Sequence, residues 1–369
     1  MIVCKRTIEK DKTMEKYLNE LIHRIRPMNQ DAQIRCEARL DSIAKPLKSL
    51  GKGEAALIRI AGIHETANIT IEKKALIIMC ADNGVVAEKI SQTGQEITAI
   101  VAENFLKQKT CVSVMAECAK VDLYPVDIGI ARETNIIQKK VAFGTKNLRV
   151  EPAMTRKQAI QSILVGIEMV EELKNKGYQM IATGEMGIGN TTTSSAIASV
   201  LLKEKVSKMT GKGAGLSREG IERKIQVITD SLELHRPNSE DILDVLAKIG
   251  GLDIGGLLGV FLGGGIHRVP IVIDGFISSV AALMAFHLNP MVRDFMLPSH
   301  ASKEPAAQRV LQEIGLTPFL DCEMCLGEGT GAIALFPFLD MLAAIYQKMS
   351  TFKEINISAY QPYYENPKQ

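Results

Sequence analysis

The chain of 369 residues has almost no excess of charge, because 44 Lys and Arg stand against 42 Asp and Glu and leave a formal net charge of +2. Binding to nucleic acid through phosphate neutralisation needs a clear basic excess, so a nucleic-acid partner is not expected. The seven cysteines are an odd number and are spread from Cys4 to Cys325, which is not the pattern of a secreted disulfide framework. We therefore expect a reducing, cytoplasmic setting.

Long apolar segments are also missing. The segment Met1–Lys12 is charged throughout and has no apolar core of the kind that signal peptides contain. The longest uncharged apolar stretch, Ile254–Ile266, has 13 residues, short of the ~20 that cross a bilayer. We expect no signal peptide, no transmembrane helix and no membrane partner.

Metal and redox motifs are scarce. The six histidines form no His-x-x-x-His pair or similar cluster, so neither a protein-bound metal nor a cofactor is expected. Cys322 and Cys325 have the spacing of a redox or zinc motif. Because no second cysteine pair or nearby histidine completes four ligands, we interpret this spacing as incidental.

The length corresponds to one large or two moderate domains, and 46% apolar with 23% charged residues is typical of a globular protein. Helical spacing of apolar residues runs over Thr13–Arg39, interrupted at Pro27, and a second helix is predicted over Gly53–Ile63. No strand pattern lies beside these helices. We expect a smaller helical domain formed by residues 1–70 and about 345–369, ending in a polar tail, and a large domain over 71–344.

Within the large domain, short continuous apolar runs alternate with helical segments. Such runs are typical of strands that are buried on both faces of a parallel sheet. The alternation predicts an α/β fold, a doubly wound Rossmann-like parallel sheet with its ligand site at the carboxyl ends of the strands. The predicted strands are Ala75–Cys80, Val121–Val126, Gln179–Thr183 and Val269–Ile273.

The segment Gly184–Ser195 combines three glycines with a hydroxyl-rich run ahead of a helix predicted to begin near Ala196. Glycines allow close backbone approach, and a helix N-terminus favours an anion such as a phosphate monoester. The alternative is a glycine-rich turn in which a threonine caps the helix. No Walker A sequence and no well-placed dinucleotide fingerprint accompany it.

A second glycine cluster, Leu326–Ala332, places Glu328 between two glycines ahead of an apolar helical run. Glu328 can be a general base if apolar surroundings raise its pKa. The alternative is a glutamate that caps the helix, whose pKa the helix dipole would lower. The loop with Ser299 and His300 could bind a hydroxyl or carboxylate, although a lone histidine is more often structural.

Taken in order, these segments resemble the nicotinate-nucleotide:dimethylbenzimidazole phosphoribosyltransferases, a family of cobamide (vitamin B12) assembly. The resemblance covers about residues 36–350. The segments that match the family are Arg39–Asp41 with Lys45-Pro46 and Ser49–Gly51, Ala81–Gly84 with Glu96–Thr98, Gly184–Thr192, Gly250–Asp253, Asp274–Phe276, Ser299-His300 with Ser302, and Leu326–Ala332.

The resemblance implies transfer of the 5-phosphoribosyl group from nicotinate mononucleotide to a ring nitrogen of 5,6-dimethylbenzimidazole, giving α-ribazole 5′-phosphate and nicotinate. The leaving pyridinium departs as nicotinate with a neutral ring, and no pyrophosphate has to be neutralised. The chain has no Asp-Asp pair of the kind that phosphoribosyl pyrophosphate enzymes use. The remaining catalytic tasks are removal of the azole proton and positioning of an oxocarbenium-like sugar.

The resemblance also implies roles for individual residues. It makes Glu328 the general base and Lys224 a charge partner of the 5′-phosphate, while Glu185 and Ser299 face the ribose or the nicotinate. The other substrate-binding residues, of which the first four cradle the phosphate, are Gly187, Gly189, Asn190, Thr191, Thr192, Asp82, Met186, Thr93 and Val101.

The chain departs from the family pattern at several of these positions. Asn83 stands where relatives commonly have a histidine, Thr93-Gly94 stands where many have Ser-Pro, and Val101 replaces a glutamine that lies near the incoming base. A valine removes a hydrogen-bond partner, and Met186 adds a deformable apolar neighbour. These changes favour a base other than dimethylbenzimidazole, such as another benzimidazole, a purine or a phenol.

Two alternatives to this enzyme remain open. One is a phenol- or p-cresol-accepting version that works as a heterodimer with a paralogue, and the other is a catalytically silent ribazole-binding subunit. Relatives are dimers, so we expect a homodimer or a heterodimer with a paralogue.

Overall fold

The computed structural model describes residues 13–213 and 215–360. The expectations for Met1–Lys12 and for the last part of the polar tail therefore lie outside the described residues. The chain divides into two compact units. The first contains Lys73–Leu335 and the described residues up to Arg26, and the second contains Pro27–Glu72 and the chain from Phe336 onward.

The first unit is built on a six-stranded sheet in which all neighbouring strands are parallel. Lys74 on β1 pairs with Val121 on β2 and with Met180 on β4, which fixes the register at the centre of the sheet. The strands, in spatial order, are β3 (Ile137–Gln138), β2 (Val121–Gly129), β1 (Lys74–Ala81), β4 (Met180–Met186), β5 (Ile271–Ile273) and β6 (Met296–Pro298).

This spatial order, 3-2-1-4-5-6, is that of a doubly wound dinucleotide-type sheet. The predicted α/β class and parallel sheet are confirmed, and each of the four predicted strands overlaps an observed one. β1 is buried at every position, which explains its continuous apolar sequence. The edge strands β3 and β6, of two and three residues, were not predicted.

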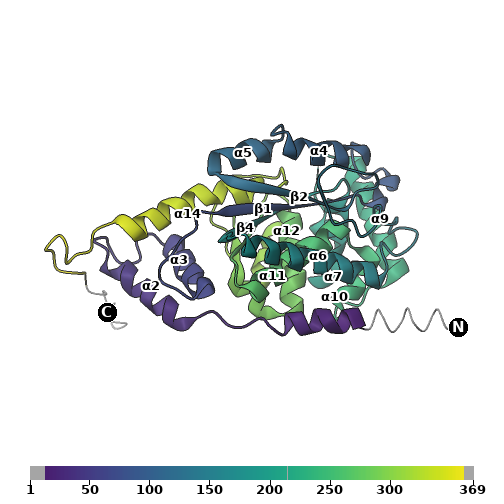
Figure 1. Cartoon of the computed structure of the whole chain (residues 1–369). Coiled ribbons are helices and arrows are strands. Elements are labelled where there is room, and N and C mark those ends of the chain that lie inside the picture. The colour runs from purple at the N-terminus through teal and green to yellow at the C-terminus, as the bar shows by residue number, and fades with distance from the viewer. Residues whose placement is uncertain (1–12, 214, 361–369) are drawn as a thin grey trace, which may run out of the picture. The chain divides into compact units, whose positions relative to one another are not determined.

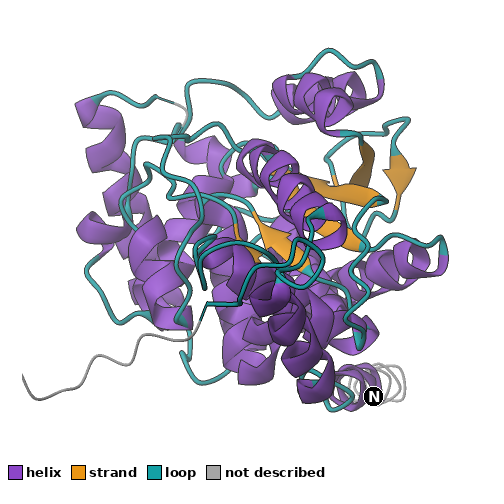
Figure 2. Cartoon of the chain, turned by 90° about the vertical axis from the view of Figure 1, so that its left-hand side faces the viewer, coloured by secondary structure: helices purple, strands orange, loops and turns teal. Residues whose placement is uncertain are grey.

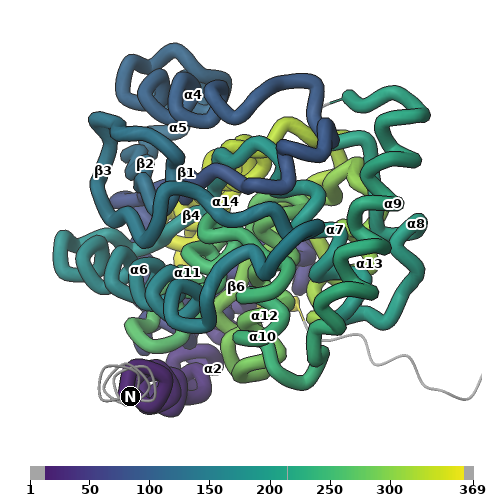
Figure 3. Tube along the Cα trace, turned by 90° about the vertical axis from the view of Figure 1, so that its right-hand side faces the viewer, coloured from purple at the N-terminus to yellow at the C-terminus, as the bar shows by residue number. Residues whose placement is uncertain are grey.

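Helices cover both faces of the sheet (Figures 1 and 2). On one face lie α4 (Glu96–Leu106) and α5 (Cys111–Ala119), which pack on β1 and β2. On the other face lie α6 (Arg156–Asn175), α11 (Leu252–His267) and α12 (Phe276–Leu288) (Figure 3). The sheet is therefore the middle layer of three.

Glycines bring α6 and α11 into close contact. A Cβ atom on Gly166 of α6 would lie 2.0 Å from the carbonyl oxygen of Gly256, and a Cβ on Gly259 of α11 would lie 2.0 Å from that of Ile163. Larger residues would force the two helices apart, so the glycine-rich sequence of α11 reflects helix packing inside the protein. This agrees with the interpretation of Ile254–Ile266 as too short to span a membrane.

The hydroxyl-rich run after β4 is itself helical, because α7 spans Asn190–Leu201. The prediction that this helix begins near Ala196 was wrong by about two turns. Serine and threonine usually disfavour helix interiors because their hydroxyls compete for backbone groups. Here the hydroxyls of Thr193 and Ser195 donate to carbonyls three and four residues earlier in the same helix.

The first unit contains six further helical elements. They are η1 (Gly84–Glu88), α8 (Val206–Met209), α9 (Arg218–His235), α10 (Ile242–Ile249), η2 (Pro290–Phe295) and α13 (Ala307–Ile314). Residues 13–22 are also helical. They group with this unit because Ile25 packs against Gly265 of α11 and Asn289 donates to the Ile22 carbonyl.

The second unit contains α2 (Gln30–Ser42), α3 (Lys52–His64) and the part of α14 (Thr330–Lys348) that begins at Phe336. Lys45 and Glu54 form a buried ion pair at 2.8 Å within it. A helical smaller domain was expected over 1–70 and about 345–369. That division stays a proposal, and the compact unit itself starts at Pro27 and resumes at Phe336.

By length and composition α14 could cross a membrane, and it is the one such helix among the described residues. The expectation of no transmembrane helix overlooked it because Asp340 interrupts its uncharged run. In the structure 56% of its apolar stretch is buried. Core helices of soluble proteins have the same property, so α14 is weak evidence for a membrane span.

Candidate active site

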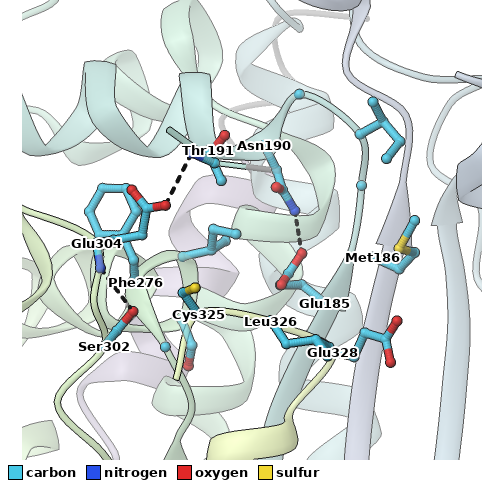
Figure 4. Close-up of a pocket in the computed structure, with 18 of the residues that line it drawn as sticks. Glu185, Met186, Asn190, Thr191, Phe276, Ser302, Glu304, Cys325, Leu326 and Glu328 are labelled. Atoms are coloured by element: carbon cyan, nitrogen blue, oxygen red, sulfur yellow. Dashed lines mark hydrogen bonds between the residues drawn. The ribbon is translucent and has the colours of Figure 1, made fainter. Parts of the chain in front are cut away.

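A cavity of about 260 Å³ opens beside the carboxyl ends of β4 and β5. This is the edge of a parallel sheet at which doubly wound folds bind their ligands, and β4 is one of the two strands, β1 and β4, between which the strand order reverses. Five loops contribute its walls (Figure 4). These loops contain Ile90–Gln92, Glu185–Thr191, Asp274–Ser278, His300–Glu304 and Cys325–Glu328, with Lys212, Gly213 and Leu216 completing the lining.

One wall, called the α7 side below, consists of Gly187, Gly189, Asn190 and Thr191 at the start of α7. Free N–H groups and the helix dipole make such a start attractive to anions. Behind it lies Lys224 of α9, which is fully buried and donates from Nζ to the Thr191 hydroxyl at 2.8 Å. Its burial lowers the pKa of the Lys224 ammonium to about 8. A buried ammonium at a helix start suits a ligand phosphate.

A buried acid cluster supports the same wall from below. The side-chain amide of Asn190 donates to the carboxylates of both Glu185 and Asp253, the latter at 3.1 Å. Burial raises the pKa of Glu185 to about 8, with the negative charges of Asp253 and Asp274 adding to the effect. Burial likewise raises the pKa of Asp253 to about 6. Near neutral pH Glu185 is therefore largely protonated.

The opposite wall, called the Glu328 side below, consists of Gly327 and Glu328 with Met186. Glu328 turns its carboxyl group away from Glu185, toward the side on which Met186 lies (Figure 4). One carboxyl oxygen, Oε2, is buried without a hydrogen-bond partner. Burial raises the pKa of Glu328, and the negative charge of Asp274 raises it further. A hydrogen bond from the backbone N–H of Val112 lowers this pKa, but by less than burial raises it. These features suit a group that accepts a proton from a ligand.

Glu328 does not cap α14. Asp274, which follows β5, accepts hydrogen bonds from the backbone N–H groups of Gly329 at 3.2 Å and Ala332 at 3.0 Å. These N–H groups lie at the start of α14, so Asp274 takes the capping role. Of the two readings of Glu328 left open by the sequence, the structure therefore argues against the cap, and the pKa of Glu328 is raised.

The backbone of Glu328 rests directly on β4. A Cβ atom on Gly184 would lie 2.5 Å from the carbonyl oxygen of Glu328. Only a residue without a side chain allows this approach.

Several residues predicted for the site do not line the cavity. Thr192 is buried within α7, and Ser299 is buried with its hydroxyl 3.0 Å from Nδ1 of His300. Asp82 is buried after β1 and accepts from the Ala131 N–H at 2.8 Å.

The loop before α4 contributes other residues than those expected. Thr93 is exposed and Val101 is half-buried on α4, and neither lines the cavity, whereas Ser91 and Gln92 do. Asn83, which replaces the histidine of relatives, is buried behind the wall, so that a Cβ on Gly187 would lie 3.1 Å from its Nδ2. Thr93 and Val101, which were predicted to bind substrate, therefore lie outside the lining of the cavity.

Sequence reasoning gave no role to Asp253, Asp274 or Glu304. Both aspartates lie in segments that match the family. Asp253 follows the pair Gly250-Gly251, and Asp274 follows a predicted strand. These positions were the signals that could have identified them. Glu304 lines the cavity, and its carboxylate accepts from the Gly213 N–H at 3.1 Å. Nothing in the local sequence of Glu304 indicates this contact, which joins two segments far apart in the chain.

No group of three or more histidine, cysteine, aspartate or glutamate side chains suited to a metal ion occurs among the described residues. Cys322 and Cys325 are free and exposed. Cys325 also lines the cavity.

Comparison with known proteins gives consistent matches along the chain. A sequence profile of a family described as Phosphoribosyltransferase matches residues 25–357. The nicotinate-nucleotide–dimethylbenzimidazole phosphoribosyltransferase of Acetivibrio thermocellus is 47% identical over 329 residues, which cover 88% of this chain and 94% of the relative. The protein of the same name from Clostridium acetobutylicum is 45% identical over 348 residues, which cover 94% of this chain and 99% of the relative.

A solved structure agrees with these matches. The crystal structure of CobT from Thermus thermophilus is similar with a TM-score of 0.84 at 33% identity, covering 89% of this chain and all of that one.

Proposed function

Since the chain belongs to this phosphoribosyltransferase family, we propose that it transfers the 5-phosphoribosyl group from nicotinate mononucleotide to a lower-ligand base such as 5,6-dimethylbenzimidazole. The products are α-ribazole 5′-phosphate and nicotinate. The observation that supports this proposal is that Glu328 and the start of α7 line one cavity. An anion site and a proton acceptor on facing walls are what the reaction requires.

In the proposed mechanism the 5′-phosphate binds on the α7 side, at Gly187, Gly189, Asn190 and Thr191. Lys224 contributes its charge through the wall, since its Nζ lies 2.8 Å from the Thr191 hydroxyl. Charge-assisted hydrogen bonds of this kind are stronger than neutral ones and fix the position of the sugar. The role of Lys224 is therefore to bind and orient.

The chemical step takes place on the Glu328 side. A ring nitrogen of the azole attacks C1′ of the ribose, while the C1′–N bond to the pyridinium breaks and its electron pair stays with the departing nicotinate. The proton on the azole passes to the Glu328 carboxylate. Burial raises the pKa of Glu328 and makes it a better base than an ordinary glutamate.

The acceptor lies, in this proposal, between Glu328 and Met186. The thioether side chain of Met186 adapts to ring systems of different shape, and the wall offers few polar partners. We expect azoles to be accepted with some tolerance. The named relatives act on dimethylbenzimidazole according to their names, so the phenol-accepting heterodimer and the silent ribazole-binding subunit gain no support.

The decisive experiment incubates the purified chain with nicotinate mononucleotide and a panel of benzimidazoles, adenine, phenol and p-cresol. Products are separated by chromatography and identified by mass. We expect ribotides of the azoles and release of nicotinate in equal amount. Absence of product from every azole would contradict the proposed function.

Two further points belong to the same proposal. We place the enzyme in the cytoplasm, as expected for a biosynthetic enzyme with free cysteines. We also propose that it is a homodimer, because the family resemblance implies a dimer. Light scattering of the purified chain tests the oligomeric state, and a mass other than that of a dimer would contradict it.

A further inference from the structure

The loop that contains Glu328 has an unusual backbone. Gly327, Glu328 and Gly329 have φ angles of +90°, +61° and +96°. Glycine adopts such angles readily, but a residue with a side chain rarely does unless its surroundings impose them. Something must therefore hold Glu328 in this conformation.

Asp274 makes the contacts that hold the loop. It is buried, and its two carboxylate oxygens accept from backbone N–H groups on either side of Thr330, at Gly329 and at Ala332. One side chain thus ties the end of the glycine loop to the first turn of α14. The loop cannot shift along the helix axis without breaking one of these bonds.

Asp274 is itself fixed to the sheet. Its own N–H donates to the hydroxyl of Ser278 at 3.2 Å, and that hydroxyl lies 2.6 Å from the Thr183 hydroxyl of β4. Thr183 in turn donates to the carbonyl of Val272 on β5 at 2.9 Å. All of these side chains are buried. The loop is therefore anchored to the two strands whose ends form the cavity.

We propose that Asp274 is a positioning residue of the transfer reaction, which holds the Glu328 carboxylate facing the acceptor. The proposal rests on the proposed function. Asp274 also acts on Glu328 electrostatically, because its negative charge adds to the effect of burial in raising the pKa of Glu328. The groups around Glu328 that set its charge state are thus Asp274 and the opposing N–H at Val112.

The test is the variant Asp274→Asn, which keeps the shape but removes the charge and offers one acceptor instead of two. We expect kcat to fall about 10-fold or more while the KM for nicotinate mononucleotide changes less than about 3-fold. The acid limb of the kcat profile should move to lower pH, because loss of the nearby charge lowers the pKa of Glu328. Asp274→Glu, which restores the charge, should return the limb toward its original pH.

A matched control is Asp127→Asn. Asp127 is also a buried carboxylate at the end of a parallel strand, where it accepts from the Ile130 N–H at 2.9 Å and from the Thr134 hydroxyl at 2.7 Å and pairs with Lys140 at 2.9 Å. Among the described residues no hydrogen bond joins it to the Glu328 loop. A general loss of folding would lower kcat in both variants without moving the acid limb in either. A shift confined to Asp274→Asn therefore reports on the loop.

Hydrogen exchange gives a readout that does not depend on turnover. Asp274→Asn should speed amide exchange across residues 327–333, and Asp127→Asn should not. Unchanged exchange there, or a kcat and an acid limb equal to those of the original enzyme, would overturn the proposal. An original enzyme that transfers to no base would contradict the proposed function instead, and the exchange result would still decide whether Asp274 holds the loop.

Discussion

On the α7 side of the cavity the wall is the start of a helix and has one residue of positive φ, Gly189, whereas on the Glu328 side three consecutive residues have positive φ angles. The hydroxyls of Thr193 and Ser195 are satisfied within α7. On the facing wall, Oε2 of Glu328 is buried and has no partner. Two further α7 hydroxyls, those of Thr192 and Ser194, are also buried without a partner among the described residues, so what distinguishes the Glu328 side is that its unpartnered atom belongs to an ionisable carboxyl group.

The difference separates two tasks. A helix start with a buried lysine offers fixed positive charge, which binds a phosphate in the ground state and in the transition state alike. A carboxylate with a raised pKa acts only when the acceptor loses its proton. Changes on the α7 side should therefore alter affinity, and changes on the Glu328 side should alter rate.

The largest effect is expected from Glu328→Gln. It removes the proton acceptor while preserving the size of the side chain, so kcat should fall at least ~10²-fold. Binding of nicotinate mononucleotide, measured by titration calorimetry, should persist because the α7 side is untouched. Turnover equal to that of the original enzyme would remove Glu328 from the mechanism and abolish the contrast between the walls.

A smaller effect on the opposite parameter is expected from Lys224→Met. Loss of a charge-assisted hydrogen bond of about 1.5–3 kcal/mol corresponds to a rise of about 10- to 150-fold in the KM for nicotinate mononucleotide. The substitution places an apolar chain in a fully buried slot, so folding should be retained. Steady-state kinetics should show kcat changed much less than KM.

The control for this variant is Lys212→Met, since Lys212 is an exposed lysine that lines the same cavity. Screening by solvent should make its effect on KM smaller. In the original enzyme KM should also rise above pH 8, where Lys224 loses its proton, and Lys224→Met should lack that rise. Equal effects of the two lysines would show that burial of Lys224 has no special importance.

The smallest effect concerns stability. The pKa of Glu185 is about 8 in the folded protein and about 4.5 when unfolded, so the folded state holds the proton more tightly. Stability from this group is complete below pH 4.5 and is lost as the pH rises through 8. The melting temperature should therefore fall between about pH 4.5 and about pH 8, and Glu185→Gln should flatten that fall by a few degrees.

Asp253 contributes with the same sign at lower pH, because its pKa is also raised, to about 6. Glu117→Gln, an exposed carboxylate on α5, serves as the control and should leave the slope unchanged. A slope that is the same in Glu185→Gln and in the original enzyme would contradict the protonated state assigned to Glu185.

Much of the architecture could be predicted because strands buried on both faces have continuous apolar sequences, as Ala75–Cys80 does. Glycine loops after such strands then indicated the cavity, since parallel strands bring their carboxyl ends to one edge. In this way the segment Gly184–Ser195 was singled out from local sequence, and Glu328 was singled out by the glycines on either side of it, whereas the individual roles of Gly187 and Asn190 came from the family resemblance.

The rest depends on contacts between distant segments, which local patterns do not contain. Lys224 reaches Thr191 from another helix, and Glu304 meets Gly213 across the cavity. The start of α7 was predicted too late in the chain because serine and threonine hydroxyls usually compete with helical hydrogen bonds. Here the hydroxyls of Thr193 and Ser195 donate to carbonyls of the same helix. In the segment before α4, the residues that reach the wall are Ser91 and Gln92, which no local pattern distinguishes from their neighbours.

The contact between Gly184 and the backbone of Glu328 limits how the enzyme can be redesigned. A methyl group at position 184 would overlap the Glu328 carbonyl oxygen and displace the carboxylate that we propose as the base, even though glycine performs no chemistry. Engineers who widen the acceptor pocket for bulkier rings must leave this strand position intact. Libraries restricted to residues that touch the acceptor would not reveal that constraint.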